Sequence, residues 1–291
     1  MPVRLPPPQL LEIAGPEAAA FAHAQFSSDV KALQTLHWQW SAWLTAQGRV
    51  RAMFRLLRLS DDCFVAFLAG GSADALRAAL VPFVLRAKVT LQPIERQAIG
   101  NFSSDDVVAT FGALPTGTTL VERGAGLALA IGGSEPRWCM LGDFAPAAAD
   151  DAAVERWRAA DIADGIAELD DSQRERFLPD ALGLGRLGAV SVRKGCYPGQ
   201  EIVARLHFKG GNKRWLHRLD YDSASSPAHG IALATADGTA SGELLNSAET
   251  SAGHGVALAV LPELPPGTIL SATGLPGSLF RVISALGVAN A

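Results

Sequence analysis

A chain of 291 residues is long enough for two or three domains, and a hydrophobic content of 48% allows it to bury a sizeable core. The formal net charge of -4 and the pI near 5.9 argue against a surface that binds nucleic acids generally. This composition also excludes a disordered chain.

Cysteine use and apolar runs point to the compartment. The three cysteines, Cys63, Cys139 and Cys196, are widely spaced and form no CxxC pair, unlike the cysteines of a secreted disulfide framework. A proline-rich stretch stands at the start in place of an apolar signal segment, and the longest apolar run, 78–85, is too short to span a bilayer. We therefore expect a cytoplasmic protein without a membrane segment.

The N-terminal third alternates strand and helix patterns without a glycine-rich dinucleotide fingerprint. This alternation favours an α+β fold over a Rossmann sheet. Pro16 is placed to open the first helix and Ser72 to cap the second. The predicted strands are 10–13, 37–45, 48–59 and 63–70, and the predicted helices are 16–26 and 72–85.

From about Pro115 the pattern begins again as a second α/β unit, and from Trp215 onward it changes. The C-terminal region has short β-prone segments separated by Gly, Pro, Asp and Ser, which is typical of a small β-barrel or sandwich. The second unit has predicted strands at 119–122, 127–131 and 137–141 and a predicted helix at 148–162. The domains are predicted as 1–110, 111–211 and 212–291.

Charge is unevenly distributed. Asp143 to Asp180 holds eleven Asp/Glu and four Arg, a balance of -7, and Arg193 to Arg218 holds seven Lys/Arg and one Glu, a balance of +6. One interpretation is two complementary solvated faces. The other is that the basic run, which includes Phe208 and Trp215, meets an anionic ligand or RNA.

The segment Lys194–Glu201 reads KGCYPGQE and places Cys196 on a glycine-flanked turn. Pro198 and Gly199 are typical of the centre of a turn, and the following residues continue as a regular element. A nearby cation stabilises a thiolate, so Lys194 is predicted to lower the pKa of Cys196. A plain structural alternative is a small residue that fills a turn.

Other cysteine chemistry has less support. A hydrolytic nucleophile needs a histidine base, and His207 and His217 belong to no recognised arrangement. Three distant cysteines do not build a zinc or iron–sulfur site, so no stably bound metal is predicted, although one thiolate could serve a cluster on another protein. Cys63 and Cys139 lie in apolar stretches and are predicted to be inert core residues.

The octapeptide KGCYPGQE resembles the hallmark of the YgfZ family, folate-binding proteins related to the aminomethyltransferase (T-protein) of glycine cleavage and implicated in maintaining iron–sulfur enzymes. The resemblance continues through FLPDALGLGRLGAVSVRKG upstream and IVARLHFKGGNKRWL downstream, and the N-terminal half contributes AAAFAHAQFSSDV, WLTAQGRVRAMFRL and VPFVLRAKVTL. It implies a ring of two ferredoxin-like α/β domains and a small C-terminal β-barrel around a central tetrahydrofolate pocket.

The stretch 155–169 is similar to the family's tryptophan-containing helix that reaches the folate. The resemblance implies that Trp157 contacts the pterin or its linked ring by stacking. Many relatives carry Glu-Ala-Gly after this tryptophan, where this chain has Ala163, Asp164 and Gly165. The pterin-binding carboxylate is therefore expected to be lost or displaced to Asp164.

Within the motif, the resemblance implies that Cys196 acts as a redox thiol or as a transient ligand to a client's cluster, with Lys194 beside it. Gln200 is a further candidate folate contact. The other motif residues are expected to shape the turn or to contact folate or a client: Gly195, Tyr197, Gly199 and Glu201.

Three functions remain open. The leading one is a folate-binding accessory protein for iron–sulfur enzymes, including enzymes that thiolate tRNA, with folate and client enzymes as partners. A folate-dependent one-carbon transferase or demethylase is disfavoured, because Arg51 and Ala52 stand where aminomethyltransferases have acidic residues. The third is an RNA-contacting module built on Arg193 to Arg218. A monomer is the default expectation.

Overall fold

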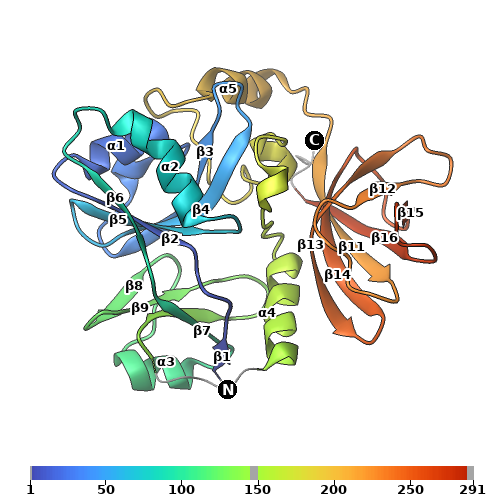
Figure 1. Ribbon diagram of the computed structural model, residues 1–291, viewed down its shortest axis with the longest axis horizontal. Coiled ribbons are helices and arrows are strands. Elements are labelled where there is room, and N and C mark those ends of the chain that lie inside the picture. Colours follow the sequence, from blue (N-terminus) through green and yellow to red (C-terminus); the bar gives the residue numbers. More distant parts are fainter. Residues whose placement is uncertain (1, 145–149, 287–291) are drawn as a thin grey trace.

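The structure is a computed structural model that describes residues 2–144 and 150–286. Figure 1 shows two sheets, one above the other, facing a barrel across helix α4 (Asp151–Ala163). Helix α5 (Gln200–Lys209) lies over the top, where the chain crosses from the first sheet to the barrel. No helix in the described ranges is both long and apolar enough to cross a membrane.

The first sheet has the strand order β3-β4-β5-β2-β6, and all neighbours are antiparallel. Helices α1 (Ala18–Gln25) and α2 (Ala73–Val84) cover one of its faces through a buried apolar cluster. Ser72 caps α2 as predicted, because its Oγ accepts a hydrogen bond from the Ala75 amide at 3.3 Å. The strands are β2 (Leu10–Ala14), β3 (His37–Leu44), β4 (Val50–Arg58), β5 (Cys63–Leu68) and β6 (Thr90–Ile94).

The second sheet has the order β1-β7-β10-β9-β8 and takes its edge strand from the start of the chain. Helix α3 (Ser104–Phe111) packs on its outer face, where Val107 and Phe111 are buried. Its left-handed C-cap, Gly112, ends the helix. The strands are β1 (Val3–Arg4), β7 (Gln97–Asn101), β8 (Leu120–Arg123), β9 (Gly126–Ala130) and β10 (Trp138–Gly142).

The C-terminal strands close into a barrel of order β11-β14-β13-β12-β15-β16. Alternating residues of these strands fill its interior, including Leu219, Tyr221 and Phe280. The strands are β11 (Trp215–Asp222), β12 (Ala232–Ala234), β13 (Ser241–Ser251), β14 (His254–Leu261), β15 (Ile269–Ala272) and β16 (Leu279–Leu286).

One apolar cluster joins the three bodies. It contains Trp38 of the first sheet, Leu129 of the second, Trp157 of α4, and Leu216 and Leu258 of the barrel. Helix α4 lies between the sheets and the barrel, so that one of its sides contacts the sheets and the other contacts β13 and β14 of the barrel. The two sheets, α4 and the barrel therefore share one apolar core.

The α+β class with a C-terminal barrel is confirmed, and most predicted strands match observed ones within a few residues. Among the strands and α-helices of the described residues, β1, β6, β7, α3 and β15 had not been predicted, and α5 had been predicted only as a regular element. The chain passes from the first sheet to the second between Ile94 and Gln97, well before the predicted boundary at residue 110, which falls inside α3. The predicted start of the 148–162 helix lies outside the described residues.

Candidate functional site

The motif turn, Lys194–Glu201, runs from a loop into the first turn of α5. Gly199 has φ +79°, and a Cβ built on it would lie 2.5 Å from the carbonyl oxygen of Thr45 in the β3–β4 hairpin. Only glycine combines this left-handed conformation with such a close approach. The turn is therefore pressed against the tip of that hairpin, while Cys196 is exposed to solvent.

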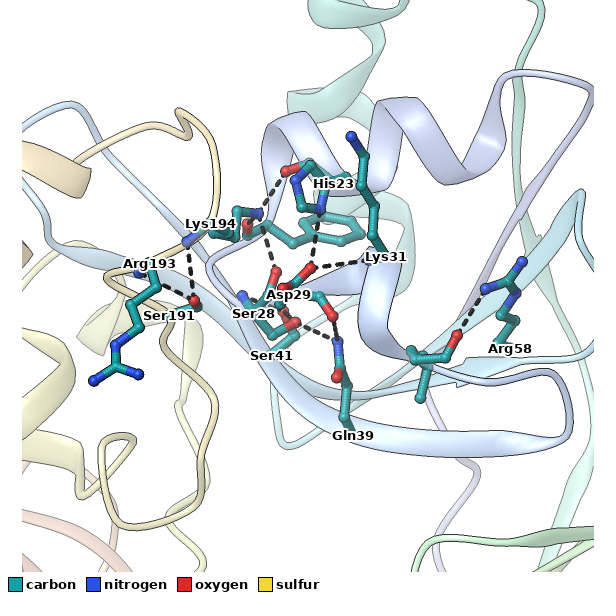
Figure 2. A network of polar contacts seen from close by, with 12 residues as sticks. His23, Ser28, Asp29, Lys31, Gln39, Ser41, Arg58, Ser191, Arg193 and Lys194 are labelled. Atoms are coloured by element: carbon teal, nitrogen blue, oxygen red, sulfur yellow. Dashed lines mark hydrogen bonds and ion pairs between the residues drawn. The ribbon is translucent and has the colours of Figure 1, made fainter.

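Lys194 is buried and points into the first domain instead of toward the thiol. Its Nζ donates hydrogen bonds to the carbonyl oxygens of His23, Phe26 and Ser28, the last at 3.0 Å (Figure 2). An ammonium group has three donors, and these carbonyls take all of them. Burial lowers the pKa of Lys194 to about 8, whereas the three acceptors favour its charged form. The prediction that Lys194 activates Cys196 thus finds no supporting contact.

A buried polar network continues from Lys194 into the sheet (Figure 2). The Ser28 hydroxyl donates to Oγ of Ser41 at 2.7 Å and accepts from the side-chain amide of Gln39 at 2.8 Å. Ser27 Oγ donates to the Ala189 carbonyl at 2.7 Å, across 162 residues of sequence. This network ties the loop before the motif to the segment that follows α1.

The remaining motif residues mostly support the turn. The Gln200 side-chain amide donates to the Lys194 carbonyl at 3.2 Å, which closes the turn on itself. Tyr197 is buried, and its ring centroid lies 4.9 Å from Lys194 Nζ. Burial raises the pKa of Tyr197 to about 12. Glu201, in contrast, is exposed at the start of α5.

The other two cysteines are poor nucleophiles for a physical reason. Cys139 is buried, and burial raises the pKa of its thiol to about 12. Burial also raises the pKa of Cys63 to about 11, although this residue is only partly buried. The core prediction is therefore right for Cys139 and wrong for Cys63, which lies at the end of β5 near the surface.

A cavity of about 240 Å³ lies where the two sheets meet α4. Its walls come from the segment 5–9, from strands β4, β5, β7 and β10, from Ile131 after β9, from α4 and from 166–168. Trp157, the residue for which the resemblance implies a pterin contact, is one of the lining residues, and Phe67 is another aromatic one. The charged lining residues are Arg55, Arg158, Asp161 and Glu168.

Trp157 is fixed tightly in the cavity wall. Its ring packs against β7 so closely that a Cβ on Gly100 would lie 2.6 Å from it. Phe102 meets the ring edge-on with centroids 5.6 Å apart, and the Arg137 guanidinium carbon lies 4.8 Å from the ring centroid. The indole is thus held rigidly and has one part facing the cavity.

Sequence reasoning missed the ionisable groups at the cavity, of which Arg55 is buried, Asp161 and Glu168 are partly buried and Arg158 is exposed. Asp161 accepts from Arg137 at 3.0 Å, yet burial outweighs this attraction and raises the pKa of its carboxyl. Burial also raises the pKa of Glu168. Arg55 stacks on Trp40 at 4.3 Å, and its Nε has no hydrogen-bond partner within residues 2–144 and 150–286. Two features of the sequence could have pointed to these groups. Arg55 interrupts an apolar strand pattern, and Asp161 follows Trp157 by one helical turn.

Asp164 does not line the cavity. Its Oδ2 accepts from Arg137 at 2.7 Å, and its Oδ1 accepts from the Ser134 amide at 2.8 Å. The carboxylate is thus used to join the end of α4 to the loop after β9. Asp161, three residues earlier, faces the cavity instead.

The structure separates the motif turn from the cavity, because no residue of Lys194–Glu201 lines it. The expectation of a thiol next to the ligand pocket therefore finds no support, and Gln200 is not among the cavity contacts. Arg51 and Ala52 lie away from the cavity too, beside Trp43, and Arg51 pairs with Glu175 at 2.8 Å. In the described part of the chain no three His, Cys, Asp or Glu side chains gather as a metal site.

Comparison with known proteins places the chain among relatives, although no family model matches it. It is 30% identical over 224 residues to the tRNA-modifying protein YgfZ of Edwardsiella ictaluri (strain 93-146), a match that covers 72% of this chain and 67% of that protein. The crystal structure of the glycine cleavage system aminomethyltransferase T from Bartonella henselae has a TM-score of 0.71 to this chain. The two chains are 17% identical, and the superposition covers 98% of this chain and 86% of the aminomethyltransferase. This similarity shows that the chain has an aminomethyltransferase-like fold. The sequence match and the shared fold together establish that the chain belongs to the YgfZ family.

Proposed function

We propose that this protein binds a folate in the cavity and serves as an accessory protein in the assembly, repair or maintenance of iron–sulfur enzymes, including those that thiolate tRNA. The observation that carries the proposal is a cavity with an aromatic wall, two partly buried carboxyl groups and the buried Arg55, whose Nε has no hydrogen-bond partner in the described residues. Such a combination is typical of a small-molecule site. The YgfZ relative, named as a tRNA-modifying protein, supports the same direction.

The cavity residues fit the ring end of a folate. A pterin is flat and aromatic, and its edge carries N–H donors and a carbonyl acceptor. Glu168 and Asp161 can accept hydrogen bonds, while the unpartnered Arg55 Nε can donate one. A cavity of about 240 Å³ is below the roughly 300–1,000 Å³ of whole-ligand pockets, so it suits the ring alone. When bound, the folate would supply a one-carbon carrier.

Titration calorimetry with tetrahydrofolate tests the cavity. Glu168→Gln keeps the shape and removes the charge, so we expect it to weaken binding about tenfold or more, as for loss of a hydrogen bond to a charged group. Glu95→Gln, at an exposed position outside the cavity, is the matched control and should bind like the native protein. Unchanged binding by Glu168→Gln would place the folate elsewhere, and no binding by the native protein would remove folate from the proposal.

The thiol acts at the surface in this proposal. Cys196 is exposed on a turn outside the cavity, where a client protein can reach it. We expect Cys196→Ser to abolish the restoration of client iron–sulfur enzyme activity in a deletion strain, while Cys63→Ser restores it fully. Full restoration by Cys196→Ser would show that the thiol has no part in the function.

A further inference from the structure

A second hollow, here called the basic groove, lies between the barrel and the segment that follows α5. It has a volume of about 640 Å³ and shares no lining residue with the cavity. Four of its lining residues are cationic and one is acidic: Arg49, Arg176, Lys213, Arg214 and Glu243. A net positive groove is unusual on a chain whose overall charge is -4.

Three of these cations keep their charge uncompensated. Arg176 is neutralised by Glu243, which accepts from its Nη1 at 2.9 Å. Arg49 donates to the carbonyl oxygen of Arg176, and Arg214 donates to the carbonyl oxygen of Ser241 at 2.8 Å. Within the described ranges neither these two arginines nor Lys213 forms an ion pair. Main-chain oxygens thus position the guanidinium groups without removing their charge, as an anion site requires.

An exposed aromatic ring stands beside this charge in the chain. Phe208, near the end of α5, is 74% exposed, and its neighbour Lys209 is exposed as well. The Phe208 and His207 rings form a T-shaped pair with centroids 4.9 Å apart, and most of the Phe208 side chain stays accessible to solvent. Gly211, only three residues later, already lines the groove. An exposed aromatic side chain beside a cationic groove is the pattern with which proteins hold single-stranded nucleic acids.

We propose that the basic groove and Phe208 form a binding site for single-stranded RNA. The phosphates lie along Arg49, Lys213 and Arg214, and a base stacks on Phe208. Phosphates alone would account for the groove, whereas the exposed ring calls for a ligand with a flat base. Because the groove and the cavity share no residue, this site works whether or not the cavity binds folate.

The test is fluorescence anisotropy with a labelled single-stranded oligoribonucleotide of mixed sequence, at several salt concentrations. Three phosphate contacts predict a slope of log affinity against log salt of about -2. The double variant Lys213→Glu/Arg214→Glu should lose at least about tenfold in affinity and flatten this slope. The matched control Lys31→Glu/Arg86→Glu makes the same charge change at two exposed residues of the first domain, outside the basic groove. It should keep nearly native affinity.

Two further measurements identify the ligand. Phe208→Ala should weaken RNA binding about fivefold or more, without changing the affinity for inorganic polyphosphate. Equal loss in both double variants would overturn the site, and equal competition by polyphosphate with no effect of Phe208→Ala would overturn RNA as its ligand. Calorimetry with tetrahydrofolate on the same variants keeps this result separate from the folate proposal, because the groove variants should bind it as the native protein does.

Discussion

The motif turn and the cavity are built in opposite ways. The turn consists of eight consecutive residues and presents Cys196 to solvent. The cavity, in contrast, collects residues from separate segments between positions 5 and 168 and holds most of its charged groups buried or partly buried. A contiguous motif arises where one stretch of backbone must follow an unusual path. A cavity between sheets needs only single residues on many strands, so it leaves no motif.

Within the turn, the residues that anchor it are distinct from the residue that can react. Lys194 and Tyr197 are buried, and Gly199 is in close contact with the hairpin, so these residues hold the turn in place. Cys196 and Glu201 are exposed. Most of the motif therefore serves to position one thiol, and a motif residue is not by itself a reacting group.

The largest expected effect tests the anchoring role of Lys194. Lys194→Met keeps the apolar stem and removes the donor to three main-chain carbonyls. We expect the free energy of unfolding to fall by roughly 2–4 kcal/mol, because these buried acceptors lose their partner. Urea unfolding followed by tryptophan fluorescence measures the change.

Cys196→Ser is the control for this experiment, since it changes an exposed residue of the same turn. Its free energy of unfolding should stay within about 0.5 kcal/mol of the native value. If Lys194→Met is as stable as Cys196→Ser, Lys194 does not anchor the turn, and a direct role at the thiol becomes the better explanation.

The next effect concerns the close approach of the turn to the β3–β4 hairpin. Gly199 and Gly112, the C-cap of α3, are both left-handed, with φ of +79° and +76°, but only Gly199 has atoms within 4 Å of an added Cβ. Gly112→Ala should therefore cost about 1 kcal/mol from backbone strain alone, and Gly199→Ala clearly more. Thermal unfolding of the two variants measures the difference, and equal losses would show that the hairpin contact does not hold the turn.

Much of the fold was readable from local patterns. The strand pattern at 63–70 and the Ser72 cap correspond to β5 and α2. The short strands β6 and β7 escaped because Pro93 and polar residues interrupt their alternation, and β1 is only two residues long. The pairing of β1 with β7 joins residues about a hundred positions apart, so a short stretch of sequence contains no sign of it.

The candidate site was predictable only where local sequence decides it. The exposed Cys196 turn and the placement of Trp157 in the cavity wall follow from KGCYPGQE and from the resemblance of the helix. The direction of Lys194 was not predictable, because its acceptors belong to 23–28. Arg55 of β4 and Glu168 of the segment after α4 become neighbours of one cavity only when this segment packs against the first sheet.

The smallest expected effect is a pH-dependent change in stability at the cavity, which the exposed residues of the turn should not show. Burial raises the pKa of Glu168 in the folded protein above its unfolded value of about 4.3. Between these two values the folded state binds more protons than the unfolded state, so the stability contributed by this group falls as pH rises through that window. Above the folded-state pKa the full cost of burying the charge is present, and Glu168→Gln removes it.

Glu168→Gln should therefore unfold at higher urea concentration than the native protein at about pH 7.5, and the difference should shrink toward about pH 4.5, where Glu168 takes up its proton. The exposed Glu95→Gln should show no such pH-dependent difference. A gain in stability combined with weaker folate binding would mean that Glu168 is kept at a cost to stability for the sake of a ligand. A loss of stability at neutral pH would mean instead that the carboxylate is satisfied within the protein, and the cavity would then lose its main acceptor for a pterin.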